Sequence, residues 1–271
     1  MILNANRKRV LGAGGGGGGY TSMSISSTDT YDWSSDGGVV ILRGWDWKPD
    51  ETTFWGIEYG GGDDVFRYDM STAADLTTVS YIGFQNGQLP TPVSMAYGDS
   101  GGYYYVLNAS DSKIYRYTTG SAYDNTSLTS GESLLTTVNS NSFIISADGS
   151  TIWLSDSVGS GGILTIDLTT PFSLTGGDTQ TLTSIDGLQV DAFCFLDSGN
   201  YLMVLDASST LGLYALSVAY DVSTKGTVID TDTLTVAAFS FSDIYVSNAN
   251  DKLFHLNGTT KLFTEYALTL A

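Results

Sequence analysis

The stretch MAYGDSGGYYYV, residues 95–106, decides the fold, because it contains an apolar strand, a turn that begins at Asp99, and a second apolar strand. The same pattern starts at WDWKPD (residues 45–50), IISAD (144–148) and FCFLD (193–197). Aspartate suits such a turn, since its carboxylate accepts hydrogen bonds from backbone N–H groups two residues further on. The turn aspartates Asp50, Asp99, Asp148 and Asp197 follow one another at intervals of 49 residues, and a shortened fifth copy places Asp243 46 residues after Asp197. Equal spacing of this kind indicates an internal repeat.

Each repeat has room for four short strands. The second strands begin at Phe54-Trp55, Tyr103-Tyr104, Ile152-Trp153, Tyr201-Leu202 and Ile244-Tyr245, and the third strands cover residues 65–68, 114–117, 163–166, 213–216 and 253–256. A later phrase recurs at Asp75, Asp124, Ser173 and Asp221, and a Thr-rich fourth strand follows each copy. Four-stranded units of about 50 residues are typical of propeller blades, which stack in a ring to bury their faces. The sequence therefore predicts an all-β, five-bladed β-propeller, with a β-sandwich as the alternative.

The repeat also sets the expected domain boundaries. The propeller is expected to cover residues 38–271, with blades at about 38–86, 87–137, 138–186, 187–233 and 234–271. Residues 1–37 lack the repeat and contain six consecutive glycines, Gly14 to Gly19, so they are expected to form a flexible arm. Whether residues 20–33 add a strand that closes the ring stays open at this point.

The charge is distributed unevenly along the chain. The formal net charge is −18, yet Arg7, Lys8 and Arg9 lie within the first ten residues. Binding of nucleic acid along the propeller is therefore not expected, because it needs clustered basic residues. The basic run favours either docking onto an acidic partner or a solvated terminus. No apolar run is long enough for a membrane helix, so membrane insertion is not expected.

Residues that could carry chemistry are few. His255 is the only histidine and Cys194 the only cysteine, which argues against a metal cluster, a disulfide or a Cys-His pair, and both are expected to be core residues. No cofactor motif is present, so no cofactor or catalytic residue is expected and the chain is interpreted as not an enzyme. A candidate general acid/base set is formed by the carboxylates Asp46, Glu51 and Asp191. Trp33, Trp45 and Trp47 are expected to pack under the arm.

Two phrases of the repeat resemble known sequences. YDMSTAADLTT (residues 68–78) and LSVAYDVST (216–224) resemble the repeat of β-propeller-like proteins that are encoded among the structural genes of tailed bacteriophages. The resemblance covers about residues 39–270. It implies a non-enzymatic structural component of the virion, located on the particle and present in several symmetric copies.

Three hypotheses about function follow. The first is a virion component whose arm, through Arg7, Lys8 and Arg9, tethers it to other virion proteins. The second is a glycan-binding module that recognises the host cell surface. The third is a polysaccharide hydrolase that uses Asp46, Glu51 and Asp191. The sequence gives neither a position on head, neck or tail nor the identity of a ligand.

Overall fold

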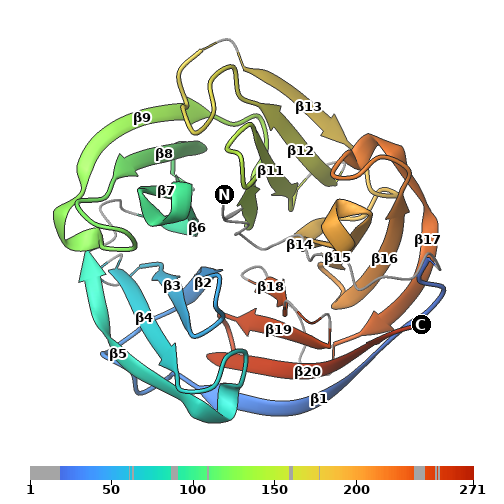
Figure 1. Ribbon diagram of the computed structural model, residues 1–271, viewed down its shortest axis with the longest axis horizontal. Coiled ribbons are helices and arrows are strands. Elements are labelled where there is room, and N and C mark those ends of the chain that lie inside the picture. The colour runs from blue at the N-terminus through green and yellow to red at the C-terminus, as the bar shows by residue number, and fades with distance from the viewer. Residues whose placement is uncertain are drawn as a thin grey trace.

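The fold is a ring of five separate sheets (Figure 1). The computed structural model describes residues 19–60, 62, 64–86, 91–108, 110–158, 161–176, 178–234, 242–247, 249 and 251–271. In these ranges each sheet has four antiparallel strands, and the helices are three-residue 3-10 turns. None of these helices is long and apolar enough to cross a membrane. The predicted five-bladed β-propeller is confirmed, and the β-sandwich alternative is wrong.

Four blades are continuous in the sequence, and each runs from its inner strand outward. Blade 1 contains β2 (Leu42–Trp47), β3 (Thr53–Glu58), β4 (Asp64–Met70) and β5 (Val79–Asn86). Blade 2 contains β6 (Pro92–Gly98), β7 (Tyr103–Asn108), β8 (Lys113–Thr118) and β9 (Thr129–Leu135). Blade 3 contains β10 (Phe143–Ile145), β11 (Thr151–Asp156), β12 (Gly162–Asp167) and β13 (Thr179–Thr183). Blade 4 contains β14 (Val190–Leu196), β15 (Tyr201–Asp206), β16 (Thr210–Leu216) and β17 (Lys225–Thr233).

Blade 5 joins the two ends of the chain. Its strands β18 (Ser242–Val246), β19 (Lys252–Asn257) and β20 (Leu262–Leu270) come from the C-terminal part, and β1 (Met23–Asp32) is its outermost strand. The pairing runs from Met23 opposite Leu270 to Asp32 opposite Leu262. Residues 23–32, expected as part of a flexible arm, therefore belong to the ring, and this segment supplies the strand that closes it.

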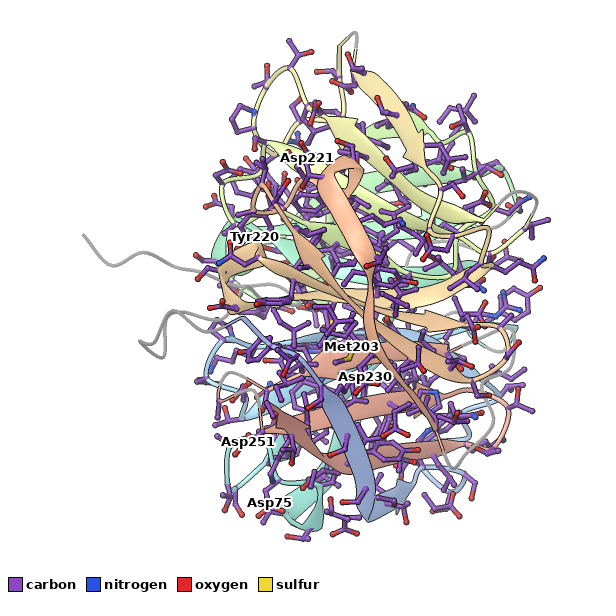
Figure 2. All side chains as sticks on the ribbon, turned by 90° about the vertical axis from the view of Figure 1, so that its right-hand side faces the viewer. Asp75, Met203, Tyr220, Asp221, Asp230 and Asp251 are labelled. Carbon is purple, nitrogen blue, oxygen red and sulfur yellow. The ribbon has the colours of Figure 1, made fainter. Side chains whose placement is uncertain are left out.

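The outer edge of β1 is held by blade 4. The backbone N–H of Met23 donates to Asp230 Oδ2 at 2.8 Å, and the N–H of Ile25 donates to Asp232 Oδ2 at 2.8 Å. Asp230 lies on β17 beside β1 (Figure 2). Each carboxylate satisfies a backbone donor that β1, as an edge strand, would otherwise present to solvent.

The closing strand changes which strand each segment of the last repeat forms, and three sequence predictions are corrected by it. Ile244-Tyr245 was expected in the second strand but lies in the inner strand β18, and residues 253–256 lie in the second strand β19, not the third. Asp243 was expected in a turn but lies within β18, fully buried. The reason is that β1 supplies the fourth strand, so each C-terminal strand lies one position further inward.

Asp243 instead links three blades at the centre of the ring. Its Oδ1 accepts the hydroxyl of Ser142 at 2.9 Å, and its Oδ2 accepts the backbone N–H of Trp45 at 3.3 Å. Because a buried carboxylate is costly unless it is hydrogen-bonded, these contacts stabilise it. The other four aspartates do lie at turns, where Asp50 and Asp148 accept N–H groups two residues on.

A second set of polar residues marks every blade at the end of its second strand. Its members are Glu58, Asn108, Asp156, Asp206 and Asn257, and all are buried. Each accepts backbone N–H groups nearby: Asp206 Oδ1 takes those of Ser208 and Thr210, both at 2.8 Å. This set therefore closes the hairpin between the second and third strands in all five blades.

Apolar side chains fill the seams, by which we mean the interfaces between neighbouring blades. The seam between blades 5 and 1 contains many aromatic rings: Trp47 stacks on Tyr245 with ring centroids 4.6 Å apart, and Trp45 stacks on Phe263 at 5.6 Å. Trp33, Trp45 and Trp47 are all buried there. Ring closure is thus stabilised by aromatic packing as well as by strand pairing.

Candidate functional site

A loop from each of blades 1 to 4 reaches into the seam with the preceding blade. In blades 1 to 4 this loop joins the third and fourth strands and holds one non-glycine residue at positive φ: Ala74, Tyr123, Phe172 and Tyr220. In blade 4 the loop is anchored by the Tyr220 N–H, which donates to Gly199 O at 2.9 Å. A Cβ on Gly199 would lie 2.6 Å from the Tyr220 ring, so glycine lets the loop lie flat on the turn below it.

The inserted residue packs on a ring of the preceding blade. Tyr123 stacks on Trp55 at 5.2 Å and Tyr220 on Trp153 at 6.0 Å. In blade 5 the third strand, β20, and the fourth strand, β1, are not consecutive in the sequence, and at the place of this loop the Tyr20 ring, just before β1, lies 4.5 Å from that of Tyr201. The N-terminal segment therefore replaces both the loop and the outer strand of the last blade.

Three of the five seams also contain a long polar side chain that bonds to the loop. Gln85 Oε1 accepts the N–H of Asn125 at 2.9 Å, Glu132 Oε2 that of Leu174 at 2.5 Å, and Glu265 Oε2 that of Leu76 at 3.1 Å. In the seam between blades 2 and 3, Arg116 also pairs with Glu132 at 2.9 Å and donates to Phe172 O. In each of these three seams a side chain of one blade is thus bonded to the loop of the next.

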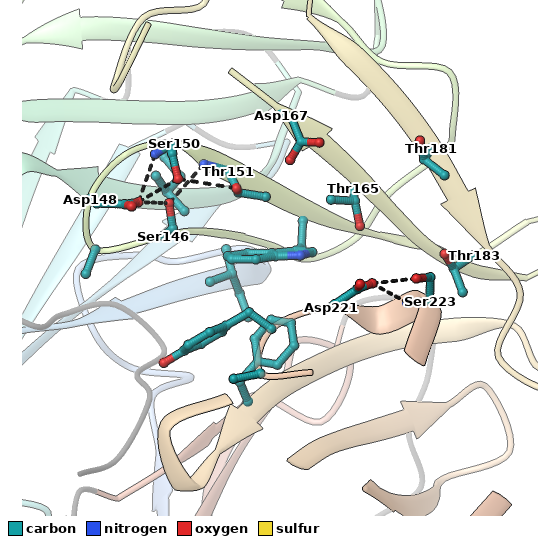
Figure 3. Close-up of a pocket in the computed structure, with 17 residues that line it drawn as sticks. Ser146, Asp148, Ser150, Thr151, Thr165, Asp167, Thr181, Thr183, Asp221 and Ser223 are labelled. Carbon is teal, nitrogen blue, oxygen red and sulfur yellow. Dashed lines mark hydrogen bonds between the residues drawn. The ribbon is translucent and has the colours of Figure 1, made fainter. Parts of the chain in front are cut away.

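The seam between blades 3 and 4 is hollow instead (Figure 3). Thr165 on β12 pairs across the sheet with Trp153 on β11. The equivalent position of the third strand is an arginine in two other blades: Arg67, which pairs with Trp55 in blade 1, and Arg116, which pairs with Tyr105 in blade 2. The neighbouring outer strand adds only Thr181 and Thr183 on this side. Because a threonine is too short to cross the seam, a cavity of about 680 Å³ remains.

The cavity has an apolar floor and a polar rim. Trp153, Phe195, Ile144 and Ile145 form the floor, and each is buried. The rim is made of hydroxyl and carboxylate groups, together with part of Tyr220: Ser146, Asp148, Ser150, Thr151, Thr165, Asp167, Thr181, Thr183, Asp221 and Ser223. The indole N–H of Trp153 has no hydrogen-bond partner among the described residues. The site therefore combines a ring surface with convergent polar groups, as small-molecule sites do.

Two of the three rim carboxylates are fixed by hydrogen bonds. Asp148 Oδ1 accepts the Ser146 hydroxyl at 2.7 Å and the Ser150 N–H at 3.0 Å. Burial opposes ionisation of Asp148, but these bonds prevail and lower its pKa below the ordinary value. Asp221 Oδ1 accepts the N–H and the hydroxyl of Ser223 at 3.0 and 2.6 Å. Each keeps a second oxygen for a ligand.

The residues that the sequence suggested for hydrolysis do not line this cavity. Asp46 is buried and accepts the N–H groups of Trp47 at 2.9 Å and Tyr97 at 2.7 Å. Glu51 lies in a turn and accepts the hydroxyl of Tyr245 at 2.7 Å.

Asp191 is buried beside Asn141, whose amide donates to it at 3.4 Å. Desolvation raises the pKa of Asp191 to about 6, and the charge of Asp206 adds to the rise. Asp46, Glu51 and Asp191 come from different elements, and no described cavity brings them together.

The remaining candidates lie elsewhere. His255 and Cys194 are both buried in the core, and burial lowers the pKa of His255 to about 3. The described residues contain no cluster of His, Cys, Asp and Glu that could hold a metal ion. Arg7, Lys8 and Arg9 lie outside the described residues.

The fold is shared with solved structures, although no family model matches the chain. No curated protein matches it in sequence either. A glutaminyl cyclase from Myxococcus xanthus has a TM-score of 0.55 at 10% identity, covering 93% of this chain and 99% of the cyclase.

Two further structures are similar. A functionally unknown protein from Desulfotomaculum acetoxidans has a TM-score of 0.50 at 11% identity, covering 85% of this chain and 75% of that one. The β-propeller domain of Cps50 (Swd1) from Myceliophteria thermophila has a TM-score of 0.48 at 11% identity, covering 86% and 65%. At such identities the likeness is one of fold.

The cyclase corrects one expectation. We expected the chain not to be an enzyme because its sequence has no recognisable catalytic cluster. The cyclase is an enzyme, and its similarity to this chain covers 99% of its length. A propeller of this kind can therefore carry catalysis, and the interpretation of the chain as a non-enzyme is wrong as a conclusion from its fold and repeat.

Proposed function

We propose that the protein binds a carbohydrate in the cavity between blades 3 and 4. The observation that supports this is the aromatic floor at Trp153 beneath a rim of hydroxyls and carboxylates. A sugar ring has one face of C–H groups, which packs on an aromatic surface, and an edge of hydroxyls, which need hydrogen-bond partners. The cavity offers both kinds of surface in one place.

The size of the cavity also favours a small ligand. Its volume of about 680 Å³ falls inside the range of roughly 300–1,000 Å³ that small-molecule sites occupy. Rim residues such as Asp167, Thr181 and Ser223 are exposed, whereas Trp153 and Phe195 below them are buried. A ligand could therefore enter from solvent and rest on the floor.

The test is to fill the cavity. Thr165→Arg restores the residue type that occupies this register in blades 1 and 2, so the blade should still fold. Thr227→Arg adds the same charge to exposed β17 outside the cavity and serves as the matched control. Calorimetric titration with a panel of soluble oligosaccharides should detect binding to the native protein and the control but not to Thr165→Arg. Equal binding by all three proteins would remove the cavity from consideration.

The virion setting remains a separate proposal that rests on the repeat phrases at 68–78 and 216–224. In that setting the ligand would be a host surface glycan and the arm with Arg7, Lys8 and Arg9 would attach the propeller to the particle. Expression of a chain without residues 1–18 in infected cells tests it. The shortened protein should fold but fail to co-sediment with particles, and unchanged co-sedimentation would reject the tether.

A further inference from the structure

All charged side chains that line the cavity between blades 3 and 4 are acidic. Asp148, Asp167 and Asp221 lie on its rim, and no Lys, Arg or His is among its lining residues. Figure 3 shows Asp148 on one side of the opening, with Asp167 and Asp221 on either side of Thr165. A ligand bound in the cavity therefore has carboxylates on more than one side.

The corresponding carboxylate of another blade is neutralised. Asp69 pairs with Thr53 in blade 1 as Asp167 pairs with Thr151 in blade 3. Arg67 binds Asp69 through two bonds of 2.9 Å each. In blade 3 the arginine position is Thr165, and the Asp167 side chain has no hydrogen-bond or ion-pair partner among the described residues. The change that opens the cavity thus also removes the cation that balances its carboxylate.

Hydrogen bonds fix the positions of the other two carboxylates. The serines beside Asp148 and Asp221 donate to one oxygen of each, as described above. For Asp148 these bonds outweigh burial and lower its pKa, so its charged form is favoured. The aromatic rings of Trp153 and Tyr220 add a further preference, since a cation is attracted to the face of such rings. Carboxylates and rings both favour a positively charged group.

We infer that the cavity selects an amino sugar whose free amine is protonated, such as a glucosamine unit of a polysaccharide. The inference rests on the proposed function, because it specifies the charge of the carbohydrate. An N-acetylated unit keeps the ring but loses the charge, and a uronic acid unit carries the opposite charge. Glucosamine, N-acetylglucosamine and galacturonic acid oligomers of equal length therefore form a charge series on similar rings.

Calorimetric titration of the full chain with these three oligomers tests the inference at low salt. The glucosamine oligomer should bind about tenfold more tightly than the acetylated one, a difference of about 1.4 kcal/mol, and the galacturonate oligomer should bind weakest. The preference should shrink as salt is added, because these rim charges are partly exposed.

Asp167→Asn should reduce the preference for the amine several-fold and leave binding of the acetylated oligomer nearly unchanged. Asp69→Asn, at the same register of blade 1 and outside the cavity, is the matched control and should keep the preference. Thermal unfolding of both variants checks that they are folded.

The outcomes separate the two proposals. Equal affinity for the glucosamine and acetylated oligomers, with Thr165→Arg abolishing both, would overturn the amino-sugar inference and leave carbohydrate binding intact. Absence of binding by all three oligomers to the folded protein would overturn both. Tighter binding of a short oligolysine peptide than of any sugar would also overturn both, because it would identify a basic peptide as the ligand.

Discussion

Replacement of the buried histidine should change how stability depends on pH. His255 is fully buried on β19, and neither ring nitrogen has a hydrogen-bond partner in the part of the chain that the structure describes. Burial lowers its pKa from 6.5 to about 3. Between these values the unfolded chain binds a proton that the folded chain does not, so this residue makes stability fall as pH falls below about 6.5.

The size of the effect follows from the same two values. From about pH 7 to about pH 5 the histidine should remove about 2 kcal/mol from the free energy of unfolding. The figure changes little if the folded pKa is anywhere below about 4, because the folded state is then unprotonated throughout this interval. His255→Leu should lack this component. It should also gain about 1–3 kcal/mol at neutral pH, since two unpartnered buried nitrogens are removed.

The assay is urea unfolding followed by tryptophan fluorescence at both pH values. Carboxylates such as Asp191 contribute their own pH dependence, but they are the same in both proteins and cancel in the difference. Ile244→Val changes the cross-strand partner of His255 and should cost about 1 kcal/mol at either pH, which makes it the control. A stability difference between native protein and His255→Leu that is the same at both pH values would refute the reasoning.

Three further predictions follow from the fold and its buried charges. Asp191→Asn should stabilise the protein above about pH 6, by roughly 3 kcal/mol at most. The reason is that the pKa of this carboxyl is raised from 3.8 to about 6, so its contribution to stability is present below the unfolded pKa and is lost as pH rises. Urea titrations of both proteins at about pH 5 and pH 8 measure this, and a variant that is less stable than the native protein at pH 8 would contradict it. Asn257→Ala should cost about 1–3 kcal/mol, since the N–H groups of Thr259 and Thr260 lose their acceptor, and an unchanged urea midpoint would be the contrary result. A chain that begins at Gly19 should unfold in one cooperative thermal transition whereas one that begins at Ser34 should not, because only the latter lacks β1; calorimetry of both proteins decides this.

The sequence predicts the ring because its signal is local and repeated. Each strand–turn–strand unit needs its aspartate or glycine at the turn and its bulky residues at one depth, and this requirement is the same in blades 1 to 4. The period of 49 residues between Asp50, Asp99, Asp148 and Asp197 reports that requirement directly. The polar residue at the end of the second strand recurs in all five blades, and its spacing would have placed the strands of the last blade correctly. Its members are Glu58, Asn108, Asp156, Asp206 and Asn257.

The fifth blade escaped prediction because its fourth strand comes from the other end of the chain. The sequence Phe241-Ser242-Asp243 is similar to the turn phrase FCFLD. Asp243 nevertheless is a buried hydrogen-bond acceptor for Trp45 and Ser142, and these long-range contacts leave no pattern in the neighbouring sequence. The cavity escaped prediction for a similar reason. Thr165 is ordinary in a strand, and its consequence is visible only by comparison with Arg67 and Arg116 at the same register.

The closing strand has a consequence for synthesis of the protein. Met23 pairs with Leu270, so β1 leaves the ribosome before the other described strands but finds its partner β20 only after all of them have been made. Such pairings between distant segments are slow, since loop closure comes before any contact is gained. Until then β1 is an unpaired strand on a nascent chain, and the carboxylates of Asp230 and Asp232, which are made just before blade 5, can accept its backbone N–H groups before β20 exists.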